Sequence, residues 1–556
     1  MAQKAWKLSD AKAPRFPEDF EIVNKAVLQL TDIVSNHNKY YAIEVHSGTQ
    51  KGRALFRVFT HYGRTDDLDT DPDAGAKECR FFDTLAEAQA AYESIYREKT
   101  APRKGYKEVS LASSRIGSTK ARGTSSGQID DLTLQKAAAK AGAATKPAET
   151  APAAPAAAPA PPPVAPPPAA ASAPAPVAAP LPAASSWTHK LKSLVGGILG
   201  STDTTTSSST KPLSAVPAPP TPPVDAAAST NGLHGRIAEL VEYVYAEATS
   251  ALTSTVAAKI TAKGIETPLG ILTLGQIQKG EVILHELYGQ FQKKKNAQGE
   301  IQRLTGEFYT LIPHRIGRTR AAVQAAVIDS LEAFEQKQET LQLMKDMLQV
   351  NGEGNVLYHS QSRAQYDALR CAIDYVDPAS PTWKEIRDYV INSQVKSKSI
   401  KVVNVFTLRR EAEWGSFAES VGNLRLMFHG SRIKNWVGLL SRGILLPKIV
   451  VSLGVNRTDA GWLGNGIYFG DAACTSAFYT TAGRKGTRFM GLARVALGRM
   501  KDYHKITYGL AGPPSGYDSC HGVRNGGKQT SQFADDEYVV YDTKQQRLEY
   551  LVEFKA

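Results

Sequence analysis

The chain has 556 residues, and its 66 lysines and arginines against 54 aspartates and glutamates give a formal net charge of +12. This length allows about three to five domains at roughly 100–200 residues each. The hydrophobic fraction of 42% supports several buried cores and excludes a wholly disordered protein. The positive charge favours a polyanionic partner.

Several classes of protein are excluded by what the sequence lacks. No run of about 18 apolar residues occurs, which excludes a membrane-spanning helix. The N-terminal segment contains no apolar stretch, so we expect no secretory signal. The four cysteines, Cys79, Cys371, Cys474 and Cys520, are far apart and form no CxxC pair. This spacing argues against a disulfide scaffold and an all-cysteine zinc module, and it is typical of a reducing compartment.

Residues 20–115 are predicted to form a small α+β domain, which we call the head. Its predicted elements are strands at 40–48 and 53–64 and a helix at 85–100. The strands are rich in β-branched and aromatic residues, whereas the helix carries apolar side chains at helical spacing. Asp83 or Thr84 is the expected N-cap of that helix.

A break in composition separates the head from the rest of the chain. Residues 137–231 consist mostly of Ala, Pro, Ser and Thr, which bury too little apolar surface to offset the entropy of ordering. We expect a flexible, partly polyproline linker over 116–231. Within it, the island 187–200 is either a short docking helix or a sticky patch of linker. The basic stretch 103–123 is either a solvated linker start or an arm that contacts phosphates.

Helical periodicity dominates the next segment and predicts an all-α bundle over 232–350. The i, i+3, i+4, i+7 pattern is carried by Ile237, Leu240, Val241 and Val244. A second helical stretch is expected to begin at Thr267–Pro268, and residues 318–348 are expected to form one long helix. Lys293–Lys295 either lie in a solvated loop or contact nucleic acid.

A mixed α/β domain built on antiparallel sheets is predicted over 355–556. Strand-like runs occur at 423–431, 487–497 and 536–542, and glycines punctuate the segments between them. Loops between such strands commonly carry a functional site. The predicted fold class of the whole chain is therefore multidomain α+β.

Three short segments of this last domain hold candidate functional residues. His429 ends an apolar strand beside Gly430 and is either a satisfied core histidine or a ligand contact. Tyr468 lies in the Gly-rich run 464–470, which is either a tight turn or a place where a flat ligand approaches the backbone. Glu537 begins an apolar strand and is either an ordinary strand-start acid or a group that polarises a hydroxyl.

Taken together, these segments resemble the catalytic domains of the poly(ADP-ribose) polymerase (PARP) family. The matching segments, in that family's order and approximate spacing, are 429–432, 464–469, 476–479 and 537–542. His429, Tyr468 and Glu537 match the family's His-Tyr-Glu triad.

The resemblance extends over most of the chain outside the linker. Residues 267–272, 276–278 and 308–314 are similar to the helical regulatory domain of DNA-dependent members. The head resembles a WGR domain, although Tyr62 stands where that signature has tryptophan, before Gly63 and Arg64. Segments 443–448, 457–459 and 513–519 are most similar to the vault-associated PARP subgroup.

The resemblance implies an enzyme that transfers ADP-ribose from NAD⁺ to protein acceptors, including the chain itself, with loss of nicotinamide and without a metal. It implies that Gly430 and Ser476 bind the nicotinamide amide, and that Tyr468 and Tyr479 enclose the ring. By the same resemblance, His429 and the adjacent Ser431 belong to the NAD⁺ site, with His429 on the adenosine ribose. Glu537 would bind the nicotinamide ribose and stabilise its oxocarbenium-like charge.

Two departures from the family bear on the product. Thr475 occupies a position where polymerising relatives often carry lysine, and Leu445 stands where some members have an arginine near the adenine. Glu537 favours elongation of poly(ADP-ribose), because its loss in this family usually goes with mono-transfer or inactivity. Polymer formation is therefore the expectation, with mono-ADP-ribosyl transfer as the alternative.

The head and the regulatory segment imply activation by DNA breaks, with Tyr62 and Arg64 as the residues that contact DNA and no membrane partner. Such an enzyme is expected in the nucleus, with the cytoplasm as an alternative. Two other interpretations stay open: an enzyme targeted by protein partners without DNA, and a non-catalytic scaffold that binds NAD⁺ or DNA.

Overall fold

The computed structural model describes residues 4–69, 71, 73–114, 116–118, 232–261, 264–291, 297–317, 319–352, 362–395, 399–446, 461–526 and 530–556. All of them belong to one compact unit formed by residues 1–145 and 212–556. The island 187–200, Lys293–Lys295 and the segment 457–459 lie outside the described residues.

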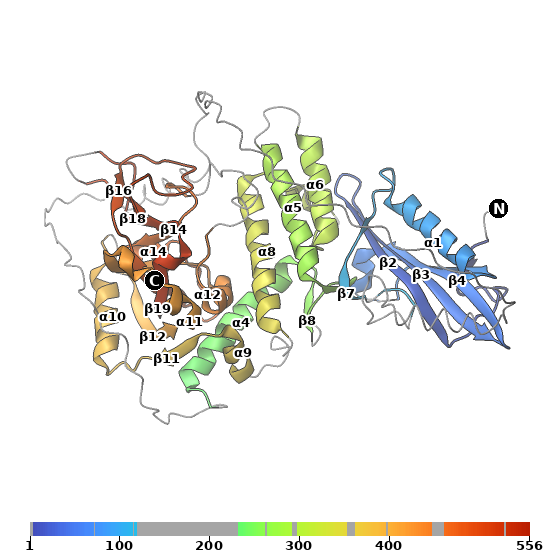
Figure 1. The fold of residues 1–556 in the computed structure, drawn as a ribbon, viewed down its shortest axis with the longest axis horizontal. Coiled ribbons are helices and arrows are strands. Elements are labelled where there is room, and N and C mark those ends of the chain that lie inside the picture. Colours follow the sequence, from blue (N-terminus) through green and yellow to red (C-terminus); the bar gives the residue numbers. More distant parts are fainter. Residues whose placement is uncertain are drawn as a thin grey trace, which may run out of the picture. The chain divides into compact units, whose positions relative to one another are not determined.

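The head is a six-stranded antiparallel sheet covered by one helix (Figure 1). The strand order is β1 (Trp6–Lys7), β5 (Ala76–Phe82), β4 (Arg53–Arg64), β3 (His37–Gln50), β2 (Phe20–Asp32) and β6 (Lys107–Glu108). The two predicted strands correspond to β3 and β4, whereas β2 and β5 were not predicted. A short 3-10 turn, η1 (Thr65–Asp69), follows β4.

The predicted head helix is α1 (Leu85–Thr100), and Thr84 is its N-cap. The Thr84 hydroxyl accepts from the backbone N–H of Glu87, and the Glu87 carboxylate accepts from the backbone N–H of Thr84. This reciprocal capping fixes the start of the helix. The buried residues Ala88 and Tyr92 then pack against the sheet in the head's apolar core.

The described residues after α1 are folded through Ser114 and again at 116–118, so the interpretation as a solvated linker start is wrong there. Contact of this basic stretch with phosphates stays a prediction. Residues Leu111–Ser114 form strand β7, which pairs with a strand of the regulatory segment. Ser118 donates through its backbone N–H and its hydroxyl to the buried Glu44 carboxylate. The linker therefore does not begin at residue 116, because residues 116–118 are buried in the head.

The regulatory segment is mostly helical but also contains a small sheet. Its helices are α4 (Gly235–Thr255), α5 (Leu274–Phe291), α6 (Gln298–Leu311), α7 (Arg320–Ala325) and α8 (Leu331–Asn351). The sheet has the order β7, β10 (Gly270–Leu272), β9 (Gly264–Glu266) and β8 (Lys259–Thr261). The head thus supplies the edge strand of this sheet, from the other side of the linker in sequence.

Two expectations for this segment are wrong in detail. Thr267–Pro268 does not begin a helix, because the Thr267 hydroxyl accepts from the backbone N–H groups of Leu269 and Gly270 and forms the turn between β9 and β10. The long helix expected over 318–348 is two helices, because Ser330 caps α8 by accepting from the Ala333 N–H. Side-chain capping at these turns competes with helix continuation.

The C-terminal domain is built on a nine-stranded sheet. The order is β11 (Ala372–Tyr375), β12 (Lys401–Arg409), β19 (Gln546–Lys555), β15 (Arg488–Ala496), β13 (Leu424–Gly430), β14 (Ile467–Gly470), β18 (Glu537–Val540), β17 (Ser519–Gly522) and β16 (Met500–Tyr503). Neighbouring strands are antiparallel except β16 and β17. The helices are α9 (Ser362–Leu369), α10 (Pro381–Asn392), α11 (Glu411–Ser416), α12 (Trp436–Arg442) and α14 (Ala473–Ala477), and the 3-10 turns are η3 (Glu419–Val421), η4 (Ile433–Asn435) and η5 (Thr543–Gln545).

The regulatory helices share an apolar core with the C-terminal sheet. Tyr243 of α4 and Phe489 of β15 are both buried in it, with ring centroids 5.7 Å apart. A buried ion pair joins α8 to α12, since the Arg442 guanidinium donates to both carboxylate oxygens of Asp346, at 2.6 and 3.0 Å. No helix of the described residues is long and apolar enough to cross a membrane.

Candidate active site

The strand register brings together the three residues predicted to form the triad. Phe428 of β13 lies opposite Gly470 of β14, and Gly470 lies opposite Glu537 of β18. His429 follows Phe428, and Tyr468 lies two residues before Gly470 on its strand. Residues more than one hundred positions apart in sequence therefore meet on three adjacent strands.

His429 is arranged as a hydrogen-bond acceptor. Its Nδ1 lies 3.0 Å from the backbone carbonyl of Tyr468, and since a carbonyl can only accept, Nδ1 carries the proton. Burial lowers the pKa of His429 below its ordinary value, so the ring is neutral near pH 7. Its Nε2 has no hydrogen-bond partner among the described residues and presents a lone pair. That lone pair suits a hydroxyl of the substrate.

Gly430 is required by the close approach of α14. A Cβ at this position would overlap the carbonyl oxygen of Ser476, and it would lie 3.2 Å from the Tyr479 Cβ. Glycine therefore keeps its bare backbone beside the helix that carries Ser476. The Ser476 side chain is buried, and its hydroxyl makes no hydrogen bond within the described part of the chain. A backbone edge and a hydroxyl without a partner form a cradle suited to a carboxamide.

Two tyrosines border this cradle in different ways. The Tyr468 hydroxyl is fixed, because it donates to the Gly464 carbonyl at 2.8 Å and accepts from the Leu463 N–H at 2.9 Å. The Tyr479 side chain is 53% exposed and leaves its ring face accessible. Fixed and accessible rings of this kind can bind a flat aromatic ligand.

Glu537 has the electrostatics of an acid–base group. Burial, and then the negative charge of Asp535, raise its pKa to about 7. Tyr468 is close enough to feel its charge, and burial above all raises the pKa of the Tyr468 hydroxyl, so this hydroxyl is neutral around pH 7. A carboxyl group that titrates near neutral pH can accept and release a proton during a reaction.

A cluster beside Glu537 was not predicted from the sequence. Asp536 accepts from His521 at 3.0 Å and from Arg524 at 2.8 and 3.1 Å. These hydrogen bonds outweigh burial and lower the pKa of Asp536 to about 2. The run Asp535-Asp536-Glu537 is the one sequence signal that could have pointed here. Asp536 thus anchors the segment that positions Glu537.

A second feature missed from the sequence ties α8 to the loop that carries Ser431. The Glu339 carboxylate accepts from Arg432 at 2.9 Å and from Asn435 at 3.0 Å, and it pairs with Lys434 at 3.0 Å. Asn435 also donates to the Ser431 hydroxyl at 3.2 Å. Because Ser431 follows Gly430 directly, a shift of α8 would move the loop beside the cradle.

The structure places the two predicted DNA contacts in internal interactions of the head. The Tyr62 ring stacks on Tyr41 with centroids 5.1 Å apart, and its hydroxyl donates to Glu78 at 2.9 Å. Arg64 pairs with Asp66 at 3.1 Å. Neither arrangement tests DNA binding, which stays a prediction.

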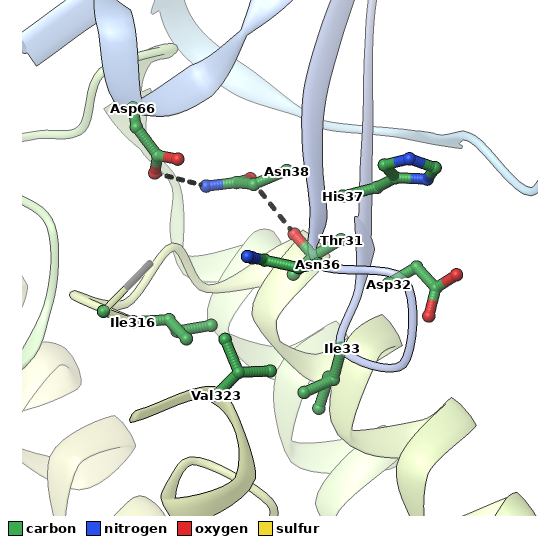
Figure 2. A pocket seen from close by; sticks show the side chains of 10 residues that line it. Thr31, Asp32, Ile33, Asn36, His37, Asn38, Asp66, Ile316 and Val323 are labelled. Carbon is green, nitrogen blue, oxygen red and sulfur yellow. Dashed lines mark hydrogen bonds between the residues drawn. The ribbon is translucent and has the colours of Figure 1, made fainter. Parts of the chain in front are cut away.

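A pocket lies away from the triad, between the head and the regulatory segment. Figure 2 shows the β2–β3 hairpin beside Ile316 and Val323, with Asn38 bonded to Asp66. An adjoining pocket is lined by the buried His314, whose pKa falls to about 3 through burial and the charge of Lys337. These pockets mark the junction and contain none of the predicted site residues.

Comparison with known families gives three matches along the chain. The WGR domain model matches residues 24–113, the PARP regulatory domain model 231–365, and the PARP catalytic domain model 380–534. The last match ends before Glu537, whose place in the site rests on its pairing with Gly470 and Gly522. Among the described residues, no group of three or more His, Cys, Asp or Glu side chains could hold a metal ion.

Curated relatives agree with these models. The mouse protein mono-ADP-ribosyltransferase PARP4 is 35% identical over 327 residues, which is 59% of this chain and 16% of that protein. Human poly [ADP-ribose] polymerase 2 is 28% identical over 52% of this chain and 53% of that protein, and chicken protein mono-ADP-ribosyltransferase PARP3 is 28% identical over 51% and 58%. The chain spans less than a fifth of the mouse relative and little more than half of the other two.

The fold and the site are similar to those of the poly(ADP-ribose) polymerase catalytic domain that the matching family model describes. With its WGR-like head, regulatory helices and catalytic domain, the chain belongs to the poly(ADP-ribose) polymerase family.

Proposed function

We propose that this chain transfers single ADP-ribose units from NAD⁺ to protein acceptors. The observation that carries the proposal is the carboxamide cradle of Gly430 and Ser476 beside an acceptor His429 and a near-neutral Glu537. The higher identity to a relative named as a mono-transferase favours a single unit over the polymer expected from the sequence.

The residues account for the reaction as follows. The bond between ribose C1′ and the nicotinamide nitrogen breaks, and its electron pair leaves with nicotinamide, which is already a cationic leaving group. Gly430 and Ser476 hold the carboxamide while the His429 Nε2 accepts from a ribose hydroxyl. The Glu537 carboxylate stabilises the oxocarbenium-like ribose. An acceptor oxygen or nitrogen then bonds to C1′ and passes its proton to Glu537.

Polymer elongation is the second candidate product, and the presence of Glu537 favours it. The two products separate on a denaturing gel after incubation of the full chain with labelled NAD⁺. Sharp bands support mono-transfer, whereas a high-molecular-weight smear supports elongation. The Glu537→Gln variant is expected to lose transfer by about a hundredfold or more, because its amide cannot accept the proton. No label on the folded wild-type chain would sink the enzymatic proposal.

We further infer that DNA breaks activate the enzyme by loosening the hold of α8 on the Ser431 loop, and that it acts in the nucleus. A continuous set of contacts supports this inference. Thr31 of the head donates through its N–H to the Thr310 hydroxyl of α6 at 2.8 Å, and strand β7 pairs with β10. Beyond α6, helices α5 and α8 pack in the same apolar core, and Glu339 of α8 bonds the loop.

The DNA inference is tested in the same gel assay with nicked DNA. A several-fold stimulation is expected for the wild-type chain. Leu269 of the regulatory segment is fully buried in an apolar cluster with head residues, so Leu269→Ala should weaken docking and uncouple activity from DNA. Leu28→Ala, the same change in the head's own apolar core, is the matched control. Equal activity with and without DNA in the wild type would contradict this inference and leave the transfer reaction untouched.

A further inference from the structure

Helix α14 carries a second buried hydroxyl beside the one expected to bind the carboxamide. Thr475 precedes Ser476 and is only 7% exposed. Among the residues that the structure describes, its Oγ1 has no hydrogen-bond partner. A threonine in a helix normally satisfies its hydroxyl by bonding a carbonyl one turn earlier, which Thr475 does not do. Burying a hydroxyl without a partner costs free energy, so a partner from outside the chain is implied.

The position of Thr475 relative to the triad identifies that partner. The Thr475 Cβ and the Ser476 Oγ lie 3.5 and 3.3 Å from the place where a Cβ on Gly470 would stand. Gly470 in turn lies directly opposite Glu537 in the sheet. Thr475 therefore stands above the strand pair that carries Glu537, next to the residue that borders the carboxamide cradle.

We infer that Thr475 is a substrate-binding residue whose hydroxyl bonds the nicotinamide-side ribose of NAD⁺. This inference rests on the proposed function. In the proposed function, Ser476 and Gly430 bind the carboxamide of NAD⁺. Glu537, on the strand opposite Gly470, binds the nicotinamide-side ribose. A hydroxyl between them gives that sugar a second hydrogen bond and fixes C1′ relative to Glu537.

The test compares Thr475→Val, which removes the hydroxyl at nearly constant shape, with Thr475→Ser, which retains it. Two probes are used in a nicotinamide-release assay on the full chain: NAD⁺, through its KM, and benzamide, a carboxamide without ribose, through its inhibition constant. Thr475→Val should raise the KM for NAD⁺ roughly three- to tenfold, the worth of one hydrogen bond, and leave benzamide inhibition unchanged. Thr475→Ser should restore most of the affinity for NAD⁺.

A stability measurement separates this role from a structural one. Removing a buried hydroxyl that has no partner should raise the unfolding temperature of the NAD⁺-free chain, although it weakens substrate binding. Thr487→Val is the matched control, because the buried Thr487 hydroxyl already donates to Glu553 at 2.6 Å. That variant should lose stability and keep its KM for NAD⁺.

The remaining outcomes are distinguishable. An unchanged KM in Thr475→Val would overturn the inference, and equal loss of NAD⁺ and benzamide binding would overturn the assignment to the ribose. A wild-type chain that neither binds NAD⁺ nor releases nicotinamide would instead overturn the proposed function.

Discussion

Two carboxylates at the start of strand β18 are neighbours in the sequence but have opposite surroundings: Asp536 directly precedes the strand, and Glu537 is its first residue. Asp536 lies beside His521 and Arg524, and the hydrogen bonds it accepts lower its pKa to about 2. Glu537 lies beside Tyr468 and Tyr479, where burial and the charge of Asp535 raise its pKa to about 7. Successive side chains of an extended segment point to opposite sides, which allows this separation.

The difference teaches how a structural acid and a reactive acid are told apart. Asp536 has its partners within the protein and remains charged. Its hydrogen bonds therefore stabilise the position of the first residues of β18. Glu537 gains no such stabilisation and changes charge near neutral pH, which a reaction can use. Two acids whose surroundings separate their pKa values are typical of a catalytic site. Four variants either break this contrast or sharpen it.

The largest effect is expected for Gly430→Ala. This variant disrupts the carboxamide cradle near Glu537 and leaves the contacts of Asp536 unchanged. The added Cβ would overlap the Ser476 carbonyl, so α14 and the end of β13 must separate. We expect nicotinamide release to fall by about a hundredfold or more, since an error of about 1 Å in substrate position can cost that much. Steady-state kinetics with NAD⁺ measure it.

Gly512→Ala is the matched control for this variant, because a Cβ there meets no atom within 4 Å. It should keep wild-type kinetics. If Gly430→Ala retained wild-type turnover with an unchanged unfolding temperature, the cradle would not be where the carboxamide binds.

A smaller effect is expected for Asp536→Ala, which removes the structural carboxylate of the pair. Arg524 and His521 would lose their shared acceptor, and the charged hydrogen bonds involved are worth about 2–3 kcal/mol in total at this partly buried site. Because the pKa of Asp536 is lowered, its contribution is present above its ordinary value of 3.8 and is lost as the pH falls through about 2.

Thermal unfolding of the full chain against pH measures this contribution. The difference between the wild type and Asp536→Ala should be constant near neutral pH and should narrow in acid. A variant as stable as the wild type at pH 7 would contradict the anchoring role of Asp536.

Asp535→Asn sharpens the comparison on the Glu537 side. Removing the negative charge of Asp535 lowers the pKa of Glu537 below about 7, whereas burial continues to hold it above the ordinary value of 4.5. The reaction needs the carboxylate, so the acidic limb of the pH profile of kcat/KM should move to lower pH by less than a unit. Activity below pH 7 would rise relative to the wild type. If the acidic limb of the kcat/KM profile did not move, ionisation of Glu537 would not determine the pH dependence of the reaction.

The sequence was sufficient to predict the three triad residues, but it was insufficient to predict the charged residues that surround them. His429, Tyr468 and Glu537 lie in short motifs whose order identifies the catalytic domain, and their strands carry period-2 patterns that predict β-structure. His521 and Asp502 lie 19 residues apart and carry no motif, although they are hydrogen-bonded. Only the pairing of β16, β17 and β18 brings them to Asp536.

Long-range contacts explain the other errors. Strand β7 was expected to be linker or arm because its partner β10 is more than one hundred residues away, beyond a segment without periodicity. The link from Glu339 to Asn435 spans 96 residues and depends on how α8 packs. Thr267–Pro268 resembles a helix start locally, but the turn between β9 and β10 uses the same hydroxyl. Tertiary context overrides local propensity at such places.

The smallest effect is expected for His521→Gln, which tests how much His521 contributes to the charged cluster around Asp536. Burial alone would lower the pKa of His521, but hydrogen bonds and charge from Asp536 and Asp502 raise it above the ordinary 6.5. Its charged form therefore contributes stability that is fully present below pH 6.5 and is lost as the pH rises through the raised value. We expect a loss of about 1 kcal/mol in acid that shrinks in base. Equal unfolding temperatures of variant and wild type at every pH would mean that the ring carries no charge in the fold, and Asp536 would then owe its low pKa to Arg524 alone.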